Sequence, residues 1–334
     1  MQKPSTTLFQ DTPAQTLIAC CDHYAGNIHF IKKAFALQQS LPFKFDITCD
    51  LEDGAQVGKE HSLRAEIIEL INSTENSQKR AGVRVHDPTH PLFRDDIEQV
   101  VTKAGEVLSH ITIPKVQGVQ IAREVTKLIT SVTNDAGISR PIPIHFLIET
   151  HQALREAWSI AEIPSVRSLE FGIMDFISSH HGAIASSAMQ SPEQFEHPLI
   201  VRAKCEIAAA ALAFGKIASH NVTIDYKNLE LVRTDAKTAL RQFGFQRMWS
   251  IHPDQISPIC SAFAPETDEI ELAGTVLQVG QEQAWGPIAV NGILYDRASY
   301  RYYWNLLRQA VYLFDNQRAK SILDSLGETV LNER

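Results

Sequence analysis

The chain has 334 residues, of which 44% are hydrophobic and 21% charged, a composition typical of a globular protein with a large core. Its 39 acidic and 31 basic residues give a net charge of −8, which argues against nucleic acid and anionic membranes as partners. No apolar run reaches the roughly 18 residues of a membrane span, and the N-terminal residues lack a hydrophobic signal core. The 5 cysteines, an odd number without a CxxC motif, favour reduced thiols. We therefore expect a cytoplasmic protein.

Short apolar runs predict eight β-strands along the chain. They lie at 16–21, 43–49, 81–86, 110–113, 142–148, 168–173, 221–224 and 247–251. The runs are nearly continuous in apolar residues rather than alternating, as is typical of parallel strands that are covered on both faces.

Amphipathic segments between these runs predict helices. The clearest are 56–71, 116–131, 206–219 and 229–243, which repeat apolar residues at helical spacing or are rich in alanine. The strand starts are about 25 to 37 residues apart, apart from one gap of about 53 residues. This alternation predicts a (β/α)8 TIM barrel. A doubly wound open sheet is the main alternative, but no GxGxxG motif follows any of the runs.

The sequence also predicts an insertion and a C-terminal extension. The long gap contains residues 180–198, which follow the sixth strand and can form either a lid over the barrel mouth or a variable surface loop. We expect residues 1–256 to form the barrel. Residues 257–334, with helical patterns at 265–283 and 299–314, are expected to form a helical extension that packs on a neighbouring subunit.

Charged and polar residues cluster just after the predicted strands, where the loops of a barrel form its active site. These residues are Asp22, His23, Asp50, Glu52, Asp53, Arg84, His86, Asp87, Lys115, Glu149, Asp175, His252 and Asp254. They come from most of the eight strands, so the pattern indicates one polar mouth.

Glu149 and Asp175 are the most informative pair in this set. They are 26 residues apart, about one strand–helix unit, and each ends a short apolar run. Their hard carboxylate oxygens suit Mg²⁺, with Mn²⁺ as an alternative, and such a metal can act as a Lewis acid on a carbonyl oxygen. Arg84 can clamp a carboxylate or stabilise an enolate. The alternative is that the acids pair with Arg84 and Lys115 and bind nothing.

Six short motifs at barrel spacing resemble a known family. They are DLED at 50–53, VRV at 83–85, IPKV at 113–116, IET at 148–150, FGxxDF at 171–176 and IHPxQI at 251–256. Together they resemble the citrate lyase β-subunit-like proteins of the HpcH/HpaI aldolase superfamily, which includes the malyl-CoA lyases. The resemblance covers roughly residues 43–310.

The resemblance implies a homotrimeric or hexameric Mg²⁺-dependent lyase. It implies cleavage or formation of a carbon–carbon bond in a β-hydroxy acid or its acyl-CoA thioester, with a 2-oxo acid or aldehyde acid fragment bound to the metal. Glu149 and Asp175 match the metal-binding carboxylates, Glu149 also contacts the substrate, and Arg84 binds the substrate acid. Asp50, Glu52 and Asp53 match an acidic turn near the metal.

Asp296 matches a C-terminal aspartate of the family that reaches a neighbouring subunit's site as an acid/base. It also precedes a predicted helix, so an acid that stabilises the helix N-terminus is an equal alternative.

Three departures from the family pattern leave the substrate open. Residues 17–27 lack the family's Arg-Ser and Pro-Gly elements, His86 replaces an asparagine, and Ser-His-His-Gly stands at 179–182 in place of Asp-Leu-Gly. The alternatives are a malyl-CoA-type thioester hydrolase on the same site, a CoA-independent pyruvate-type aldolase and a non-catalytic scaffold subunit.

Overall fold

The computed structural model describes residues 3–9, 17–53 and 58–328, and most of them form a closed eight-stranded barrel. Each strand pairs in parallel with the next, and β8 pairs with β1. The strands are β1 (Cys21–Ala25), β2 (Asp46–Asp50), β3 (Ala81–Arg84), β4 (Ile111–Ile113), β5 (Ile144–Ile148), β6 (Val166–Phe171), β7 (Ile217–His220) and β8 (Arg247–Ser250). The predicted (β/α)8 barrel is confirmed.

Two of the predicted strands are displaced from the observed ones. β1 begins at Cys21, where the predicted strand ends, and β7 ends at His220, directly before the predicted strand at 221–224. The prediction followed apolar residues, whereas these two strands carry polar residues that the barrel buries. Asp22 and His23 therefore lie inside β1 and not after it, which corrects their expected place at the mouth.

The barrel interior is polar, in contrast to the predicted near-continuous apolar runs. Because side chains alternate along a strand, each strand sends one set inward and the other outward. Ile47, Ile111 and Phe146 belong to the outward set and are fully buried apolar residues. The inward set includes buried polar residues that contact one another across the barrel. We call these the interior cluster: Asp22, Asp46, Thr48, His110, His145, Glu170 and Arg247.

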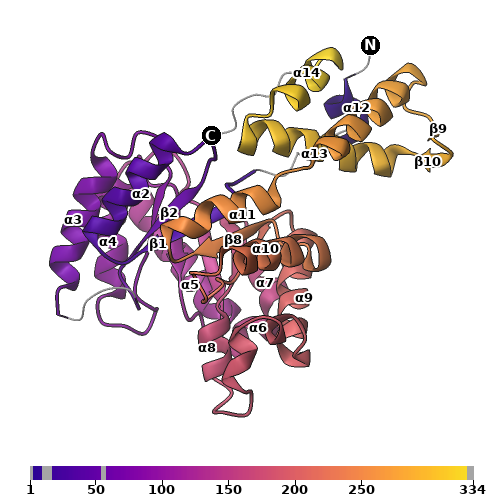
Figure 1. Cartoon of the computed structure of the whole chain (residues 1–334). Coiled ribbons are helices and arrows are strands. Elements are labelled where there is room, and N and C mark those ends of the chain that lie inside the picture. The colour runs from indigo at the N-terminus through magenta and orange to yellow at the C-terminus, as the bar shows by residue number, and fades with distance from the viewer. Residues whose placement is uncertain (1–2, 10–16, 54–57, 329–334) are drawn as a thin grey trace. The chain divides into compact units, whose positions relative to one another are not determined.

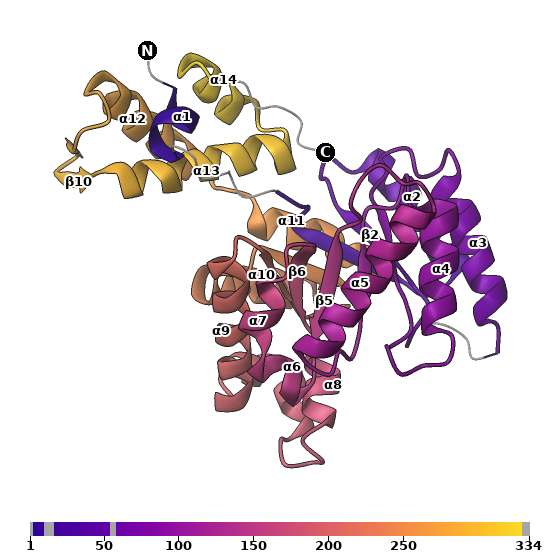
Figure 2. The same ribbon diagram turned by 180° about the vertical axis from the view of Figure 1, so that it is seen from behind.

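Helices surround the strands (Figure 1). They are α2 (Ile28–Ser40), α3 (Glu60–Asn72), α4 (Phe93–Ala104), α5 (Val119–Asp135), α6 (His151–Arg155), α7 (Ala157–Ala161), α8 (Ile173–Ser178), α9 (Pro198–Ala213), α10 (Leu229–Phe243) and α11 (Ile256–Phe263), with short 3₁₀ turns η1 (Ser186–Met189), η2 (Glu193–Phe195) and η3 (Pro253–Gln255). Both views place α6 and α8 at the same end of the barrel, where β5 and β6 end (Figure 2). None of the helices described is both long enough and apolar enough to cross a bilayer.

The insertion at 180–198 is anchored at its C-terminal half. Gln194 in η2 is 1% exposed, and it accepts a hydrogen bond from Lys204 Nζ (3.0 Å) and donates one to Asp235 Oδ2 (3.1 Å). Lys204 is itself fully buried and donates to Asn221 Oδ1 at 2.9 Å. These contacts hold η2 against α9 and α10, which favours a fixed surface segment over a lid in this half.

A second compact unit contains residues 42–44 and the chain from Ala264 onward, together with the N-terminal helix. Its elements are α1 (Pro4–Phe9), α12 (Thr267–Glu282), the hairpin of β9 (Ile288–Val290) and β10 (Ile293–Tyr295), α13 (Arg297–Phe314) and α14 (Gln317–Ser325). Trp285, Tyr300 and Leu307 lie in its own apolar core. The boundary falls after Phe263 rather than at residue 256, because α11 packs on α10 and β1 of the barrel. Packing on a neighbouring subunit stays a prediction.

Candidate active site

Glu149 lies just past the end of β5 and is buried, with 3% of its surface exposed. Its Oε1 accepts a hydrogen bond from the backbone N–H of Lys115 at 2.6 Å. A Cβ atom on Gly172 would lie 2.0 Å from Glu149 Oε2, so the glycine makes room for this carboxylate. Burial, and then the charge of Asp175, raise the pKa of Glu149 to about 8. Within the described part of the chain, Glu149 forms no ion pair.

Asp175 lies in the first turn of α8, which follows β6 directly. Its side chain is 38% exposed, and its Oδ1 is 3.8 Å from Lys115 Nζ. Since its charge is the second largest cause of the shifted Glu149 pKa, the two carboxylates belong to one site. The structure therefore brings the predicted pair together at the end of adjacent strands.

Arg84 ends β3 and is held by the acidic turn that follows β2. Its Nε and Nη2 donate to the two oxygens of Asp50 at 2.7 and 2.6 Å, and its Nη1 lies 3.0 Å from Glu52 Oε2. The guanidinium also lies over the Tyr24 ring, 5.3 Å from its centroid. A bidentate pair of this kind fixes the plane of the guanidinium.

Lys115 connects the acidic turn to Asp175. Its Nζ bonds with Glu52 Oε1 and lies 3.1 and 3.2 Å from the two oxygens of Asp53. Burial acts to lower the pKa of Lys115, but its contacts with Glu52 more than offset this effect and raise it. We call the whole set the mouth cluster: Asp50, Glu52, Asp53, Arg84, Lys115, Glu149 and Asp175. The predicted alternative, an ion-pair network with Arg84 and Lys115, accounts for most of these acids but leaves Glu149 without a cation.

A second group of possible metal ligands lies in the interior cluster. One donor atom each from Asp22, His110 and His145 lies within 4.8 Å of the others. However, Arg247 Nη2 is 2.6 Å from Asp22 Oδ2, His110 Nε2 bonds with Thr48 Oγ1 at 2.8 Å, and the two histidine rings stack at 4.3 Å. Arg247 already supplies the cation here, and two imidazoles and one carboxylate do not form the all-oxygen set that Mg²⁺ prefers.

Sequence reasoning missed this interior cluster because its members lie within strands and not after them. A polar residue inside an otherwise apolar run, such as His145 in residues 142–148, was the available signal. Tyr24 joins the two clusters, because it donates to Glu170 Oε2 at 3.0 Å and carries Arg84 on its ring.

The predicted mouth histidines have partners of their own. His23 Nδ1 bonds with Ser250 Oγ at 2.8 Å, and burial lowers its pKa to about 4. His86 Nδ1 bonds with Asp96 Oδ2 at 2.6 Å. His252 caps η3. These contacts are structural hydrogen bonds of the kind that position a neutral or charged imidazole.

Asp296 lies in the second compact unit, where it is the N-cap of α13. Its Oδ1 accepts from the backbone N–H groups of Ala298 (3.0 Å) and Ser299 (3.2 Å). This is the helix N-terminal position of the predicted alternative, and the acid/base role stays a prediction.

Comparison with known proteins places the chain in a class. The sequence model of the HpcH/HpaI aldolase/citrate lyase family matches residues 33–253, and the chain belongs to this family. Aldolases and citrate lyases act on carbon–carbon bonds, in agreement with the predicted enzyme class.

Individual relatives refine this assignment. A citrate lyase structure from Burkholderia xenovorans is 43% identical, with a TM-score of 0.86 that covers 96% of this chain and 100% of that chain. The L-malyl-CoA/beta-methylmalyl-CoA lyase of Cereibacter sphaeroides is 24% identical over 278 residues, which are 79% of this chain and 86% of the relative. Protein CitE of Mycobacterium tuberculosis, solved with magnesium, acetoacetate and coenzyme A, is 21% identical, with a TM-score of 0.67 over 87% of this chain and 98% of that chain, and so has the same fold.

Proposed function

We propose that this protein is a Mg²⁺-dependent carbon–carbon lyase that cleaves or forms a β-hydroxy acid or its acyl-CoA thioester. The observation that carries the proposal is Glu149, a buried carboxylate that has a raised pKa and no ion pair within the described residues. A buried carboxylate without a cation is costly unless it is protonated or binds a metal.

The donor set fits Mg²⁺. Glu149 and Asp175 would hold the ion through hard carboxylate oxygens, and a divalent charge would offset the burial and the repulsion from Asp175 that raise the pKa of Glu149. When bound, Mg²⁺ supplies a Lewis acid for the oxygen of the 2-oxo acid fragment. The Lys115 backbone N–H fixes one oxygen of Glu149, and Gly172 leaves space for the other.

Arg84 has donors left for a substrate carboxylate. Of the five N–H groups of a guanidinium, two point at Asp50 and one faces Glu52, so two remain. In cleavage, the β-hydroxyl group becomes a carbonyl as the carbon–carbon bond breaks, and the other fragment leaves as an enolate. The proton that the hydroxyl group releases balances the one that the enolate later takes up at carbon, so the reaction consumes no net proton. A guanidinium held in place by Asp50 offsets the negative charge of that enolate.

The enolate then takes a proton at carbon. We assign this proton transfer to Asp296 of a neighbouring subunit within a homotrimer or hexamer, on the resemblance of residues 291–296 to the family's C-terminal segment. The capping bonds at the start of α13 would hold this carboxylate in a fixed direction. Size-exclusion chromatography with light scattering measures the subunit number, and a monomer would exclude this assignment.

The relatives support an acyl-CoA substrate, because several are named malyl-CoA or citramalyl-CoA lyases. A thioesterase on the same site is the second candidate, and the family departures around β1 and after Asp175 favour a third, a CoA-independent pyruvate-type aldolase. Product analysis with malyl-CoA separates the three. A lyase releases an oxo acid and an acyl-CoA, a hydrolase releases a free hydroxy acid and CoA, and a CoA-independent aldolase leaves malyl-CoA intact.

The metal assignment is tested by calorimetric titration of Mg²⁺. We expect Glu149→Ala and Asp175→Ala each to weaken Mg²⁺ binding by more than about tenfold, since even outer residues of metal sites contribute that much. Glu66→Ala, an exposed acid on α3, is the control and should leave the affinity unchanged. Unchanged affinity in both site variants would refute the assignment.

A further inference from the structure

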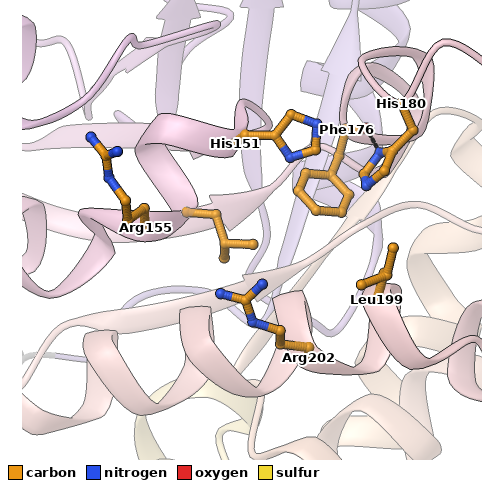
Figure 3. Close-up of a pocket in the computed structure, with 7 residues that line it drawn as sticks. His151, Arg155, Phe176, His180, Leu199 and Arg202 are labelled. Atoms are coloured by element: carbon orange, nitrogen blue, oxygen red, sulfur yellow. Dashed lines mark hydrogen bonds between the residues drawn. The ribbon is translucent and has the colours of Figure 1, made fainter.

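A cavity of about 320 Å³ lies at the barrel end that carries the mouth cluster, between α6, α8 and α9. Figure 3 shows its lining: the rings of His151, Phe176 and His180 lie together at one side, while Arg155 and Arg202 extend from different helices. In the described part of the chain, the lining residues are His151, Leu154, Arg155, Phe176, His180, Leu199 and Arg202. None of the predicted site residues lines this cavity.

Among the described residues, the cavity lining contains two arginines and no carboxylate. Arg155 pairs with Glu156, whose Oε1 lies 2.6 Å from its Nη2 and which does not line the cavity. Arg202 forms no ion pair or hydrogen bond in the portion of the chain described. Both arginines line the cavity, and their positive charge attracts an anion. Their planar forks match the oxygens of a carboxylate or a phosphate.

The remaining lining is apolar except for His151 and His180. Phe176 and Leu154 are buried, and Leu199 is 43% exposed although it is a large hydrophobic residue. The Phe176 ring contacts His180 at 4.9 Å and His151 at 5.4 Å between ring centroids. His180 donates its Nδ1–H to the backbone carbonyl of Phe176 at 2.7 Å. Small-molecule sites commonly combine such an apolar wall with a few charged groups.

We propose that this cavity binds a small amphiphilic organic anion. Its carboxylate or phosphate group pairs with Arg155 and Arg202, and its hydrocarbon part packs on Phe176 and Leu199. This assignment is independent of the function proposed for Glu149 and Asp175. The cavity nevertheless adjoins their elements, because Phe176 follows Asp175 in α8 and His151 begins α6 two residues after Glu149.

Two probes test the proposal, phenyl phosphate and 3-phenylpropanoate, each titrated by calorimetry into the full-length protein. We expect saturable binding of at least one probe, and the tighter probe identifies the preferred oxyanion. Arg202→Gln and Arg155→Gln should each weaken binding by about tenfold, as expected for loss of a charged hydrogen bond. Inorganic phosphate should bind more weakly than phenyl phosphate, because it lacks the apolar part.

Matched controls separate this cavity from other cationic sites. Arg123→Gln alters an exposed arginine on α5 that does not line the cavity, and Arg84→Gln alters the mouth cluster. Both variants should retain probe binding. Absence of binding for both probes, or binding that persists in Arg155→Gln and Arg202→Gln, would overturn the proposal. Loss of binding in Arg84→Gln alone would overturn it as well and would place the probe at the barrel mouth.

Discussion

The interior cluster and the mouth cluster, two groups of buried or partly buried charged residues in the barrel, differ in how completely their charges are paired. In the interior cluster, Arg247 lies 2.6 Å from Asp22 and also bonds with Asp46, while Arg80 is 2.9 Å from Asp46. Glu170 accepts from Tyr24 and lies 3.0 Å from His145. Each interior acid therefore has a side-chain partner within the cluster.

The mouth cluster is paired only in part. Arg84 and Lys115 neutralise the acidic turn, and Lys115 is also 3.8 Å from Asp175. Among the residues that the structure describes, Glu149 has only the Lys115 backbone N–H as its hydrogen-bond donor. Buried acids that all contact a side chain of the same cluster serve the fold, whereas a buried acid with only a backbone donor, beside a second carboxylate, is a place for a ligand. The comparison separates a structural cluster from a candidate catalytic one within a single barrel.

The largest expected effect comes from opening the interior cluster. Arg247→Met leaves Asp22 and Asp46 buried with less positive charge, and removal of one partner from a buried ion pair costs about 3–5 kcal/mol. We expect the free energy of unfolding in urea to fall by that order, without a specific loss of Mg²⁺ affinity in protein that stays folded. Arg318→Gln, which breaks an exposed pair with Glu271, should change stability only slightly, because solvent screens the two charges. If both substitutions lowered the free energy of unfolding equally, the interior cluster would contribute no more to stability than an exposed ion pair does.

The second effect is the pH dependence that Glu149 introduces. Its pKa is about 8 in the folded protein and 4.5 in the unfolded chain, so the folded state binds more protons between these values. Stability should therefore fall as the pH rises from about 4.5 to 8. Glu149→Gln should remove this decline and stabilise the metal-free protein at pH 8 by on the order of 3 kcal/mol.

Urea unfolding from pH 5 to 8.5 measures this effect, and Mg²⁺ should reduce the decline in the unaltered protein only. Asp135→Asn, at the end of α5, is the control. A stability that rises with pH in the unaltered protein but not in Glu149→Gln would show that Glu149 has a lowered pKa.

The barrel and most of the mouth cluster could be predicted from the sequence, for a physical reason. Acidic residues that directly follow apolar strands can be recognised from the sequence as site candidates, since the ends of parallel strands meet at one rim of the barrel. Glu149, Asp175 and Arg84 were found in this way. The interior cluster could not be predicted in this way, because its polar residues lie within strands. A search for apolar runs places the end of a strand at the first polar residue. For this reason the predicted positions of β1 and β7 differ from the observed ones.

The sequence also could not predict which residues of the mouth cluster form ion pairs with one another. Which acids Lys115 neutralises depends on its backbone, since its φ of 48° and the N–H bond to Glu149 fix where the side chain begins. The boundary of the second unit depended on the packing of α11, and the place of α1 in that unit depended on contacts with α13, far along the chain. Such long-range contacts leave no periodic signal.

The smallest expected effect follows from substitution of Lys115, which connects the acidic turn of the mouth cluster to Asp175. Its ammonium group, 3.8 Å from Asp175 and 29% exposed, competes with Mg²⁺ for that carboxylate. Lys115→Met should therefore raise Mg²⁺ affinity by several-fold, because partly exposed charge pairs contribute about 1 kcal/mol or less. The metal-free protein should lose stability, since Asp53 loses the cation it pairs with and Glu52 keeps only Arg84, and Mg²⁺ should restore part of it. Calorimetric titration and urea unfolding with and without Mg²⁺ measure both, with Lys127→Met on α5 as the control. Weaker Mg²⁺ binding in Lys115→Met, at unchanged stability, would instead show that Lys115 supports the metal site rather than competing for it.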